Sequence, residues 1–310
     1  MQKMATHRSA GLKSWARKGR QGFVTGFLLL LSLALGACGS GESGDGTERE
    51  GPLQAVATVG HLGDIVANVG GEHVSVTSLM GAGVDPHLYV ATESDVEALQ
   101  QADVIFYNGL FLEAQMTDVM EQLAERKPVT AVGETIPADR LLPWADYADE
   151  FDPHIWFDVT LWMQAVEAIR DTLTEVDPEN AAAYEANAAA YLAELSELHT
   201  YVQEQVATIP EAQRVLITAH DAFTYFGQAY GFDVRGLQGI STATEASTAD
   251  VQALVDFIVE NEIPAIFIES SVPVRNVEAL QAAARAQGWE VAIGGELFSD
   301  AMGNPGTPEG

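Results

Sequence analysis

The sequence of 310 residues contains one cysteine, Cys38, so it can form neither an internal disulfide nor a site built from several thiolates. It is also poor in positive charge, with 15 lysines and arginines against 45 aspartates and glutamates. Such a surface repels nucleic-acid phosphate, which excludes a nucleic-acid partner. Acidity of this degree is as typical of adaptation to high salt as of cation binding, so the charge alone identifies no ligand.

The compact motifs of catalysis are missing as well. The chain has no nucleophile elbow, no phosphate-binding loop and no dinucleotide-binding glycine pattern. It also lacks the closely spaced histidines of the His-Glu-x-x-His type that hold a catalytic metal. The sequence therefore does not predict an enzyme.

The first 37 residues are typical of an export signal. Residues 1–20 are basic and polar, and residues 23–35 form an apolar run that is too short to span a membrane comfortably. Small residues lead to Cys38, and LGAC resembles a bacterial lipobox, in which the cysteine carries the lipid anchor. The alternative is a buried free cysteine. Residues 38–52 are rich in Gly, Ser and acid, which predicts a flexible tether to the membrane.

The rest of the chain alternates short apolar strands with helical segments, which predicts an α/β fold with mostly parallel sheets. We expect two similar βα lobes, residues 53–176 and 211–310. One long helix over residues 177–210 should join them, because its apolar residues recur every three or four positions and its interior lacks Gly and Pro. A helix of that length spans roughly 45 Å. The alternative is a long helix within one domain.

Three histidines and one aspartate occupy similar places in this alternation. His87, His154 and His220 each follow a strand or loop and precede a helix, and Asp300 follows the last strand. Ligands of open α/β sheets lie beyond the carboxyl ends of the strands, so the four side chains can meet in one cleft, two from each lobe. Three imidazoles and a carboxylate suit a divalent metal such as Zn²⁺ or Mn²⁺.

Several neighbouring residues are weaker candidates. Glu269 ends a buried strand, where it either orients a ligating histidine or caps the next helix. Three aspartates close to the candidate histidines either fix ring tautomers or cap helices, and we favour caps for Asp85, Asp152 and Asp221. No metal role is expected for the remaining histidines, His7, His61, His73 and His199.

Five stretches give the chain a specific resemblance: GVDPHLYVATESDV, DPHIWFDV, RVLITAHDAFTYFGQAYG, AIFIESSVP and GGELFSDAMG. The chain resembles the metal-binding lipoproteins of ABC importers, the cluster A-I solute-binding proteins for zinc, manganese or iron. The resemblance covers nearly all of the mature chain. It implies that His87, His154, His220 and Asp300 are the metal ligands.

The resemblance also implies the setting in which the protein works. A monomer, anchored by its lipid to the outer face of the cell membrane or held in the periplasm, would capture the metal between its lobes. It would deliver the metal to a membrane permease and its ATPase. The family usually continues beyond position 310 with a helix on the second lobe, so we expect a chain cut short there.

Two features bear on which metal is bound. Manganese-selective members commonly have Glu at the third ligand position, so His220 favours zinc. The zinc-specific branch often carries a His-rich acidic loop before the second ligand, but residues 137–151 are short and contain no histidine. Zinc is the first expectation because three imidazoles favour it. Manganese comes next, and iron is a third candidate.

Two other functions fit the same residues. One is a metal-dependent hydrolase with Glu269 as its base. The other is a surface adhesin-type lipoprotein with a structural metal.

Overall fold

The computed structural model describes residues 51–145, 147 and 150–308. The predicted signal segment, Cys38 and nearly all of the tether lie outside the described residues. Residues 1–48 and 49–310 form separate units, and the fold given below is that of the second. Among the described residues, no helix has both the length and the apolar character needed to cross a membrane.

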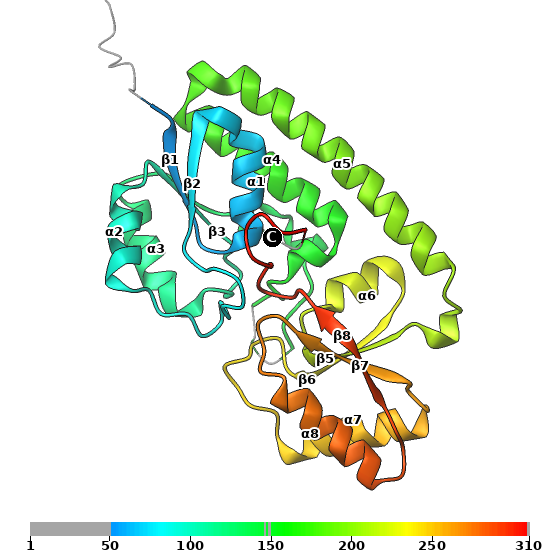
Figure 1. Ribbon diagram of the computed structural model, residues 1–310. Helices are drawn as coiled ribbons and strands as arrows, with labels where there is room; N and C mark the ends of the chain where they lie inside the picture. The colour runs from blue at the N-terminus through cyan, green and yellow to red at the C-terminus, as the bar shows by residue number, and fades with distance from the viewer. Residues whose placement is uncertain (1–50, 146, 148–149, 309–310) are drawn as a thin grey trace, which may run out of the picture. The chain divides into compact units, whose positions relative to one another are not determined.

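The first lobe is built on a four-stranded parallel sheet with the strand order β2-β1-β3-β4. Helices α2 and α3 lie on one side of this sheet and α1 on the other, next to α4 and α5 (Figure 1). Helices on both faces bury the central strands, which explains why β1 and β3 are nearly continuous apolar runs. The elements are β1 (Leu53–Ala57), α1 (Gly60–Gly70), β2 (Val74–Ser78), α2 (Glu93–Gln101), β3 (Val104–Tyr107), α3 (Thr117–Ala124), β4 (Val129–Ala131) and α4 (Val159–Val176).

The second lobe contains two parallel strand pairs, β5 with β6 and β7 with β8. Because β5 and β7 lie side by side, the order β6-β5-β7-β8 repeats that of the first lobe. This confirms the prediction of two similar βα lobes with parallel strands. The elements are β5 (Val215–His220), α6 (Thr224–Tyr230), β6 (Asp233–Gln238), α7 (Thr248–Glu260), β7 (Ala265–Glu269), α8 (Arg275–Ala286) and β8 (Ala292–Leu297).

The long helix α5 (Ala181–Ala207) runs from the first lobe to the second (Figure 1). At 1.5 Å per residue its 27 residues span roughly 40 Å. It starts later than predicted, because residues Pro178–Asn180 form a 3₁₀ turn. There the carboxylate of Asp177 accepts hydrogen bonds from the Asn180 amide and the Tyr184 hydroxyl, at 2.8 and 2.6 Å, with no side-chain cap on the first turn of the helix.

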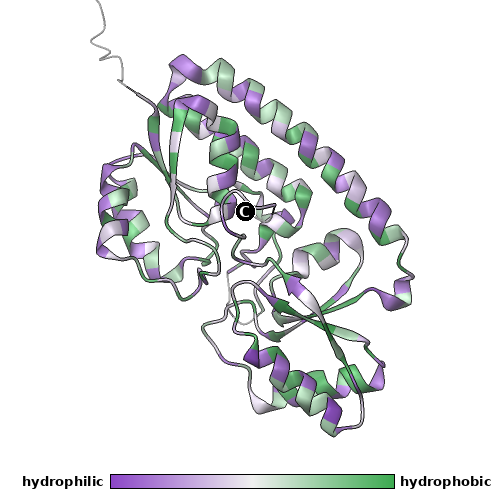
Figure 2. Cartoon of the chain, viewed as in Figure 1, coloured by the Kyte–Doolittle hydropathy of each residue, from purple (hydrophilic) through white to green (hydrophobic). Residues whose placement is uncertain are grey.

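Polar side chains attach α5 to both lobes. Tyr191 donates to Asp64 of α1 at 2.7 Å, and His199 pairs with the hydroxyl of Tyr230 of α6 at 3.0 Å. The helix buries only part of its predicted apolar stripe, since Leu198 is 45% exposed. Figure 2 accordingly shows hydrophilic and hydrophobic residues alternating along it. The helix is thus a strut with one face in solvent.

Two buried apolar cores lie on either side of the lobe junction. The first combines the sheet of the first lobe with α1, α4 and α5, and the second fills the space around β5, β7, α7 and α8. Helix α6 belongs to the second lobe in sequence, yet its Tyr225 and Tyr230 pack in the first core. The lobes therefore share an apolar attachment at α6.

Local details correct three of the predicted boundaries. Helix α2 is capped by Thr92 and α7 by Ser247, one or two residues before the predicted caps, each in a capping box with an aspartate. Strand β8 begins at Ala292, three residues later than predicted. Helix α3 begins only at Thr117, because Leu110 and Phe111 adopt positive φ angles and turn the chain first.

Gly236 of β6 gives the first testable prediction. A Cβ at this position would come within 3.0 Å of backbone atoms of His220 and Asp221, which no side-chain rotation can relieve. We expect Gly236→Ala to lower the free energy of unfolding by about 1–3 kcal/mol, measured by urea denaturation. Gly81→Ala is the control, because nothing lies within 4 Å of a Cβ placed at that position. Equal stability of the two variants would contradict the close approach.

Candidate metal centre

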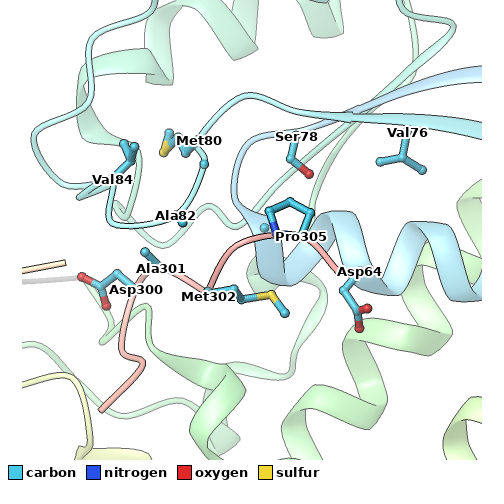
Figure 3. A pocket seen from close by; sticks show the side chains of 13 residues that line it. Asp64, Val76, Ser78, Met80, Ala82, Val84, Asp300, Ala301, Met302 and Pro305 are labelled. Carbon is cyan, nitrogen blue, oxygen red and sulfur yellow. The ribbon is translucent and has the colours of Figure 1, made fainter. Parts of the chain in front are cut away.

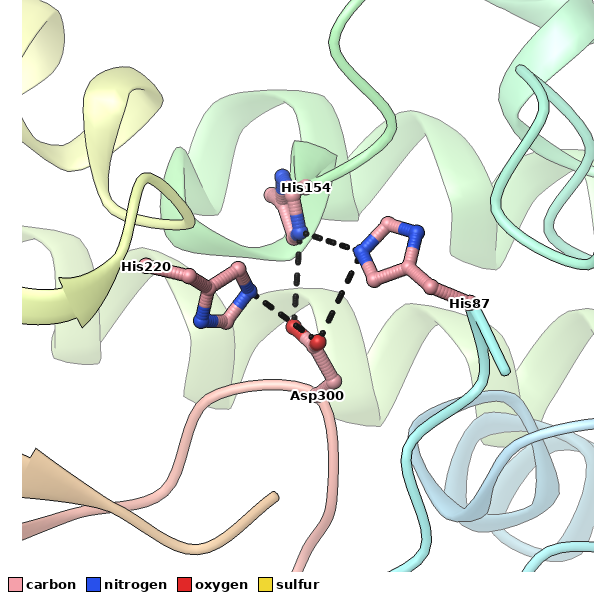
Figure 4. A group of neighbouring side chains, drawn as sticks. All are labelled: His87, His154, His220 and Asp300. Carbon is pink, nitrogen blue, oxygen red and sulfur yellow. Dashed lines mark hydrogen bonds and ion pairs between the residues drawn. The ribbon is translucent and has the colours of Figure 1, made fainter. Parts of the chain in front are cut away.

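The four candidate ligands reach the site from four separate segments. His220 is the last residue of β5, and Asp300 lies three residues beyond β8. His87 lies in the loop between β2 and α2, and His154 lies between β4 and α4. The parallel strands bring these segments to one edge in each lobe, and the structure brings the four side chains together there, as Figure 4 shows.

The cluster is compact and buried. One ligating atom from each residue lies within 4.8 Å of all the others, and none of the four residues is more than 2% exposed. Nε2 of His87 and Nε2 of His154 are 3.3 Å apart. The Asp300 carboxylate lies 3.1 Å from Nε2 of His220 and 3.4 Å from Nε2 of His154.

These separations fit a tetrahedral ion. Zinc bonds to imidazole nitrogen and carboxylate oxygen of about 2.0–2.2 Å place neighbouring ligand atoms roughly 3.3–3.6 Å apart. The separations to Asp300 range from 3.1 to 3.7 Å. No side chain of the cluster has to move far to accept such an ion.

Hydrogen-bond direction supports the same interpretation. Nε2 of His220 and both Asp300 oxygens are buried, yet among the described residues none has a hydrogen-bond partner of acceptable geometry. They lie within ion-pair distance of one another, but their lone pairs and N–H bonds do not point along those lines. Buried polar atoms are almost always hydrogen-bonded, so orphaned atoms around one point indicate a missing central partner.

Two ligand histidines are strongly influenced by carboxylates. Burial lowers the pKa of His154, but Asp152 and Asp300 beside the ring outweigh burial and raise that pKa to about 9. For His220, burial is likewise outweighed, here by Asp300 and Glu269, and its pKa lies well above the usual value. Burial would raise the pKa of Asp300, but His220 and His154 hold it well below its usual range.

His87 behaves differently, because it has no carboxylate of its own. Burial lowers its pKa to about 3, and the attraction of Asp300 does not compensate. Its ring is therefore neutral at pH 7, with a free lone pair for a metal. The metal-free cluster thus balances the buried Asp300 carboxylate against protons on the other two rings.

Carboxylates also determine which ring nitrogen faces the centre. Glu269, the last residue of β7, lies 2.5 Å from Nδ1 of His220 and accepts the His220 backbone N–H at 2.8 Å. Asp152 lies 2.7 Å from Nδ1 of His154. Both contacts occupy Nδ1 and leave Nε2 directed at the site, as in many metal centres.

The helix caps expected for the three aspartates are wrong. Asp152 contacts the ring of His154, as the alternative held. Asp85 accepts the His87 backbone N–H at 2.9 Å and the Thr242 hydroxyl at 2.6 Å. Asp221 accepts the Thr224 hydroxyl at 2.7 Å, whereas the first turn of α6 has no side-chain cap. The cap signal failed because these aspartates precede loops or turns that position ligands.

His61 lies close to the cluster but is not part of it. Its ring stacks on Trp156, with centroids 4.9 Å apart and planes inclined by 23°. Burial lowers the pKa of His61 to about 4, so the ring is neutral. Of the other histidines, His199 bonds to Tyr230, and His73 contacts the ring edge of Tyr184. These contacts agree with the expectation that none of the three is a ligand.

A cavity of about 400 Å³ adjoins the cluster at Asp300 (Figure 3). Asp300 lies at one end of the cavity and Asp64 at the other, with Met80, Met302 and Pro305 between them. The loop after β2 and the segment after Asp300 therefore enclose a space that one candidate ligand borders. Sequence reasoning found no sign of this cavity, because its walls come from both lobes.

Comparison with known proteins identifies the family. The family model for zinc-uptake complex component A, periplasmic, matches residues 55–310. The chain belongs to this family. It is 45% identical over 291 residues to the manganese-binding lipoprotein MntA of Bacillus subtilis, covering 94% of each chain.

A second relative is known in three dimensions. The chain is 50% identical over 261 residues to the zinc-binding protein TroA of Treponema pallidum, covering 84% of each. The solved structure of periplasmic TroA superimposes with a TM-score of 0.82, covering 84% of this chain and 93% of that one. The relatives thus share the two-lobed fold with this chain, while their names divide between zinc and manganese.

The contact between Glu269 and His220 gives the second prediction. We expect Glu269→Gln to weaken zinc binding by about 10–100-fold, because a neutral amide holds Nδ1 of His220 less firmly. Competition with a chromogenic chelator measures this change. Glu113→Gln is the matched control: Glu113 is equally buried and accepts N–H groups of Asn108 and Gly109, but far from the cluster in sequence and element. An equal loss of affinity in both variants would contradict an orienting role.

Proposed function

We propose that the protein is the substrate-binding component of an ABC importer for a divalent metal, which it captures between its lobes and delivers to a permease. One observation carries the proposal. Four buried ligand atoms from both lobes converge within 4.8 Å, and several of them lack a hydrogen-bond partner among the described residues. The family and its named relatives supply the transport context.

The proposed ligands are His87, His154 and His220 through Nε2, together with the carboxylate of Asp300. The proposed roles of Asp152 and Glu269 are to hold the rings of His154 and His220. The metal would replace the protons that balance the Asp300 charge in the metal-free cluster. A neutral His87 would bind without losing a proton.

Zinc is the proposed cargo, with manganese next. Three imidazoles and one carboxylate within tetrahedral spacing suit zinc, whereas manganese prefers more oxygen ligands. The relatives leave both metals open, since TroA is named for zinc and MntA for manganese. Iron is the third candidate.

The proposed location is the outer face of the cell membrane or the periplasm. The basic and apolar segment before Cys38 and the lipobox-like LGAC support export and lipid anchoring. Relatives that carry the word lipoprotein in their names support the same inference. The proposed partners are a membrane permease and its ATPase, with the protein acting as a monomer. The domain limits at residues 37, 52, 176 and 210 belong to this proposal.

Catalysis is not part of the proposal. A hydrolase would need Glu269 free to activate a water, but one of its oxygens accepts the His220 backbone N–H and the other pairs with the ring. The adhesin alternative requires a metal that holds the fold together. The two lobes instead have extensive apolar cores away from the cluster, which favours a folded metal-free protein.

The third prediction concerns metal content. We expect the purified chain to bind one equivalent of zinc by elemental analysis and to remain folded when the metal is removed, as judged by circular dichroism. His220→Ala should weaken zinc binding by at least about 100-fold, since it deletes a ligand. Zinc should also raise the melting temperature of the wild type, because it binds only the folded state. The absence of stoichiometric metal would overturn the site, and unfolding on metal removal would favour the structural alternative.

The fourth prediction concerns selectivity. We expect His220→Glu to shift the ratio of zinc to manganese affinity toward manganese by roughly tenfold, because a carboxylate is a harder ligand than imidazole. Competitive titration of both metals against one chelator measures the ratio. The matched control is His199→Glu, which introduces the same charge on α5 away from the cluster. An unchanged ratio in His220→Glu would show that this position does not set selectivity.

A further inference from the structure

The lobes are joined in two physically different ways. Around α6 the junction is apolar: Tyr225 packs in the first core, and Phe223 stacks on Phe157 with ring centroids 4.2 Å apart. The Tyr225 hydroxyl also donates to the backbone carbonyl of Asp152 at 3.0 Å. Burial of large aromatic rings makes this side of the junction costly to separate.

Beside the metal cluster the junction is polar. The indole N–H of Trp156 donates to the backbone carbonyl of Ser299 at 3.1 Å, and thereby crosses from the first lobe to the second. The hydroxyl of Thr242 donates to Asp85 at 2.6 Å and crosses in the opposite direction. Single hydrogen bonds of this kind are exchanged for bonds to water at small net cost, so this side can open.

Both hydrogen bonds are attached directly to ligand-bearing segments. Trp156 lies two residues after His154, and Ser299 immediately precedes Asp300. Asp85 receives the Thr242 hydroxyl on one oxygen and the backbone N–H of His87 on the other. Each bond therefore links a ligand-bearing segment of one lobe to the backbone or side chain of the other lobe.

The partners of these bonds are held in place. The face of Trp156 is covered by the ring of His61 from α1, at 4.9 Å. Ser299 is buried, its hydroxyl lies 3.0 Å from that of Ser271, and its N–H donates to Ser270. Thr242 is only 8% exposed. Displacing a ligand segment must therefore strain or break the bond to the opposite lobe.

We propose that Trp156 and Thr242 are positioning residues that couple metal retention to lobe closure. With both bonds made, the ligands from the two lobes stay within bonding distance of one ion. When the bonds break, the lobes part at the cluster while α6 remains attached, and the ion loses ligands from one lobe. This inference rests on the proposed transport function and assigns to it two residues outside the ligand set.

The test uses the full chain loaded with zinc. Trp156→Phe removes only the indole N–H and keeps a ring, and Thr242→Val removes only the hydroxyl. We expect each variant to bind one equivalent of zinc but to release it to excess chelator about three- to tenfold faster than the wild type in stopped-flow measurements, since each loses one bond that holds the lobes closed. The double variant should be faster than either single variant.

Matched controls separate closure from general stability. The indole of Trp289 donates to the backbone carbonyl of Ile263 at 2.7 Å within the second lobe, so Trp289→Phe makes the same chemical change away from the junction. Thr160 donates to Asp158 at 2.7 Å within the first lobe, and Thr160→Val matches Thr242→Val. Both controls should release zinc at the wild-type rate.

A second readout distinguishes positioning from a merely structural role. Positioning predicts that the melting-temperature increase caused by zinc shrinks in the two junction variants and stays unchanged in the controls. A structural role would lower the metal-free and zinc-loaded melting temperatures equally. Wild-type release rates and an undiminished zinc increment in Trp156→Phe and Thr242→Val would overturn the coupling and leave the transport function standing. A wild type without stoichiometric zinc would overturn both.

Discussion

A buried carboxylate is the constraint on which the site depends. Asp300 is 2% exposed and makes no hydrogen bond of acceptable geometry among the described residues. A charge in such surroundings is costly unless opposite charge lies beside it, and here the rings of His154 and His220 supply that charge in the metal-free state. Because Asp300 belongs to the second lobe and His154 to the first, the carboxylate is satisfied only when the lobes are together. A divalent ion at the same point would satisfy it more fully.

The fold presents ligands from both sides of that point. Each lobe repeats the same parallel strand order, so the carboxyl ends of its strands form one edge that carries ligands. Helix α5 runs between the lobes, and α6 packs in the core of the first lobe. These two attachments restrict the lobes to small relative movements. The hydrogen bonds of Trp156 and Thr242 lie where such a movement would separate the ligands.

Much of this could be predicted from the sequence, because the signals are local. Alternating apolar strands and helices predicted the α/β lobes, and the long helix followed from its apolar period. The positions of His87, His154, His220 and Asp300 after strands or loops predicted that they would meet. The errors are local too: Asp152 was favoured as a helix cap, but it contacts the ring of His154 two residues later. A short-range motif does not show which of two nearby partners a carboxylate takes.

The sequence by itself determined the elements, the family resemblance and the residue types that can hold a metal, since these depend on composition and spacing along the chain. Only the tertiary structure decided which contacts cross between the lobes. The pairing of Glu269 with His220 depends on β5 and β7 ending side by side, and those residues are 49 positions apart. The bond from Trp156 to Ser299 joins residues 143 positions apart. Contacts at such separations are set by strand order and lobe packing, which leave no periodic signal in the chain.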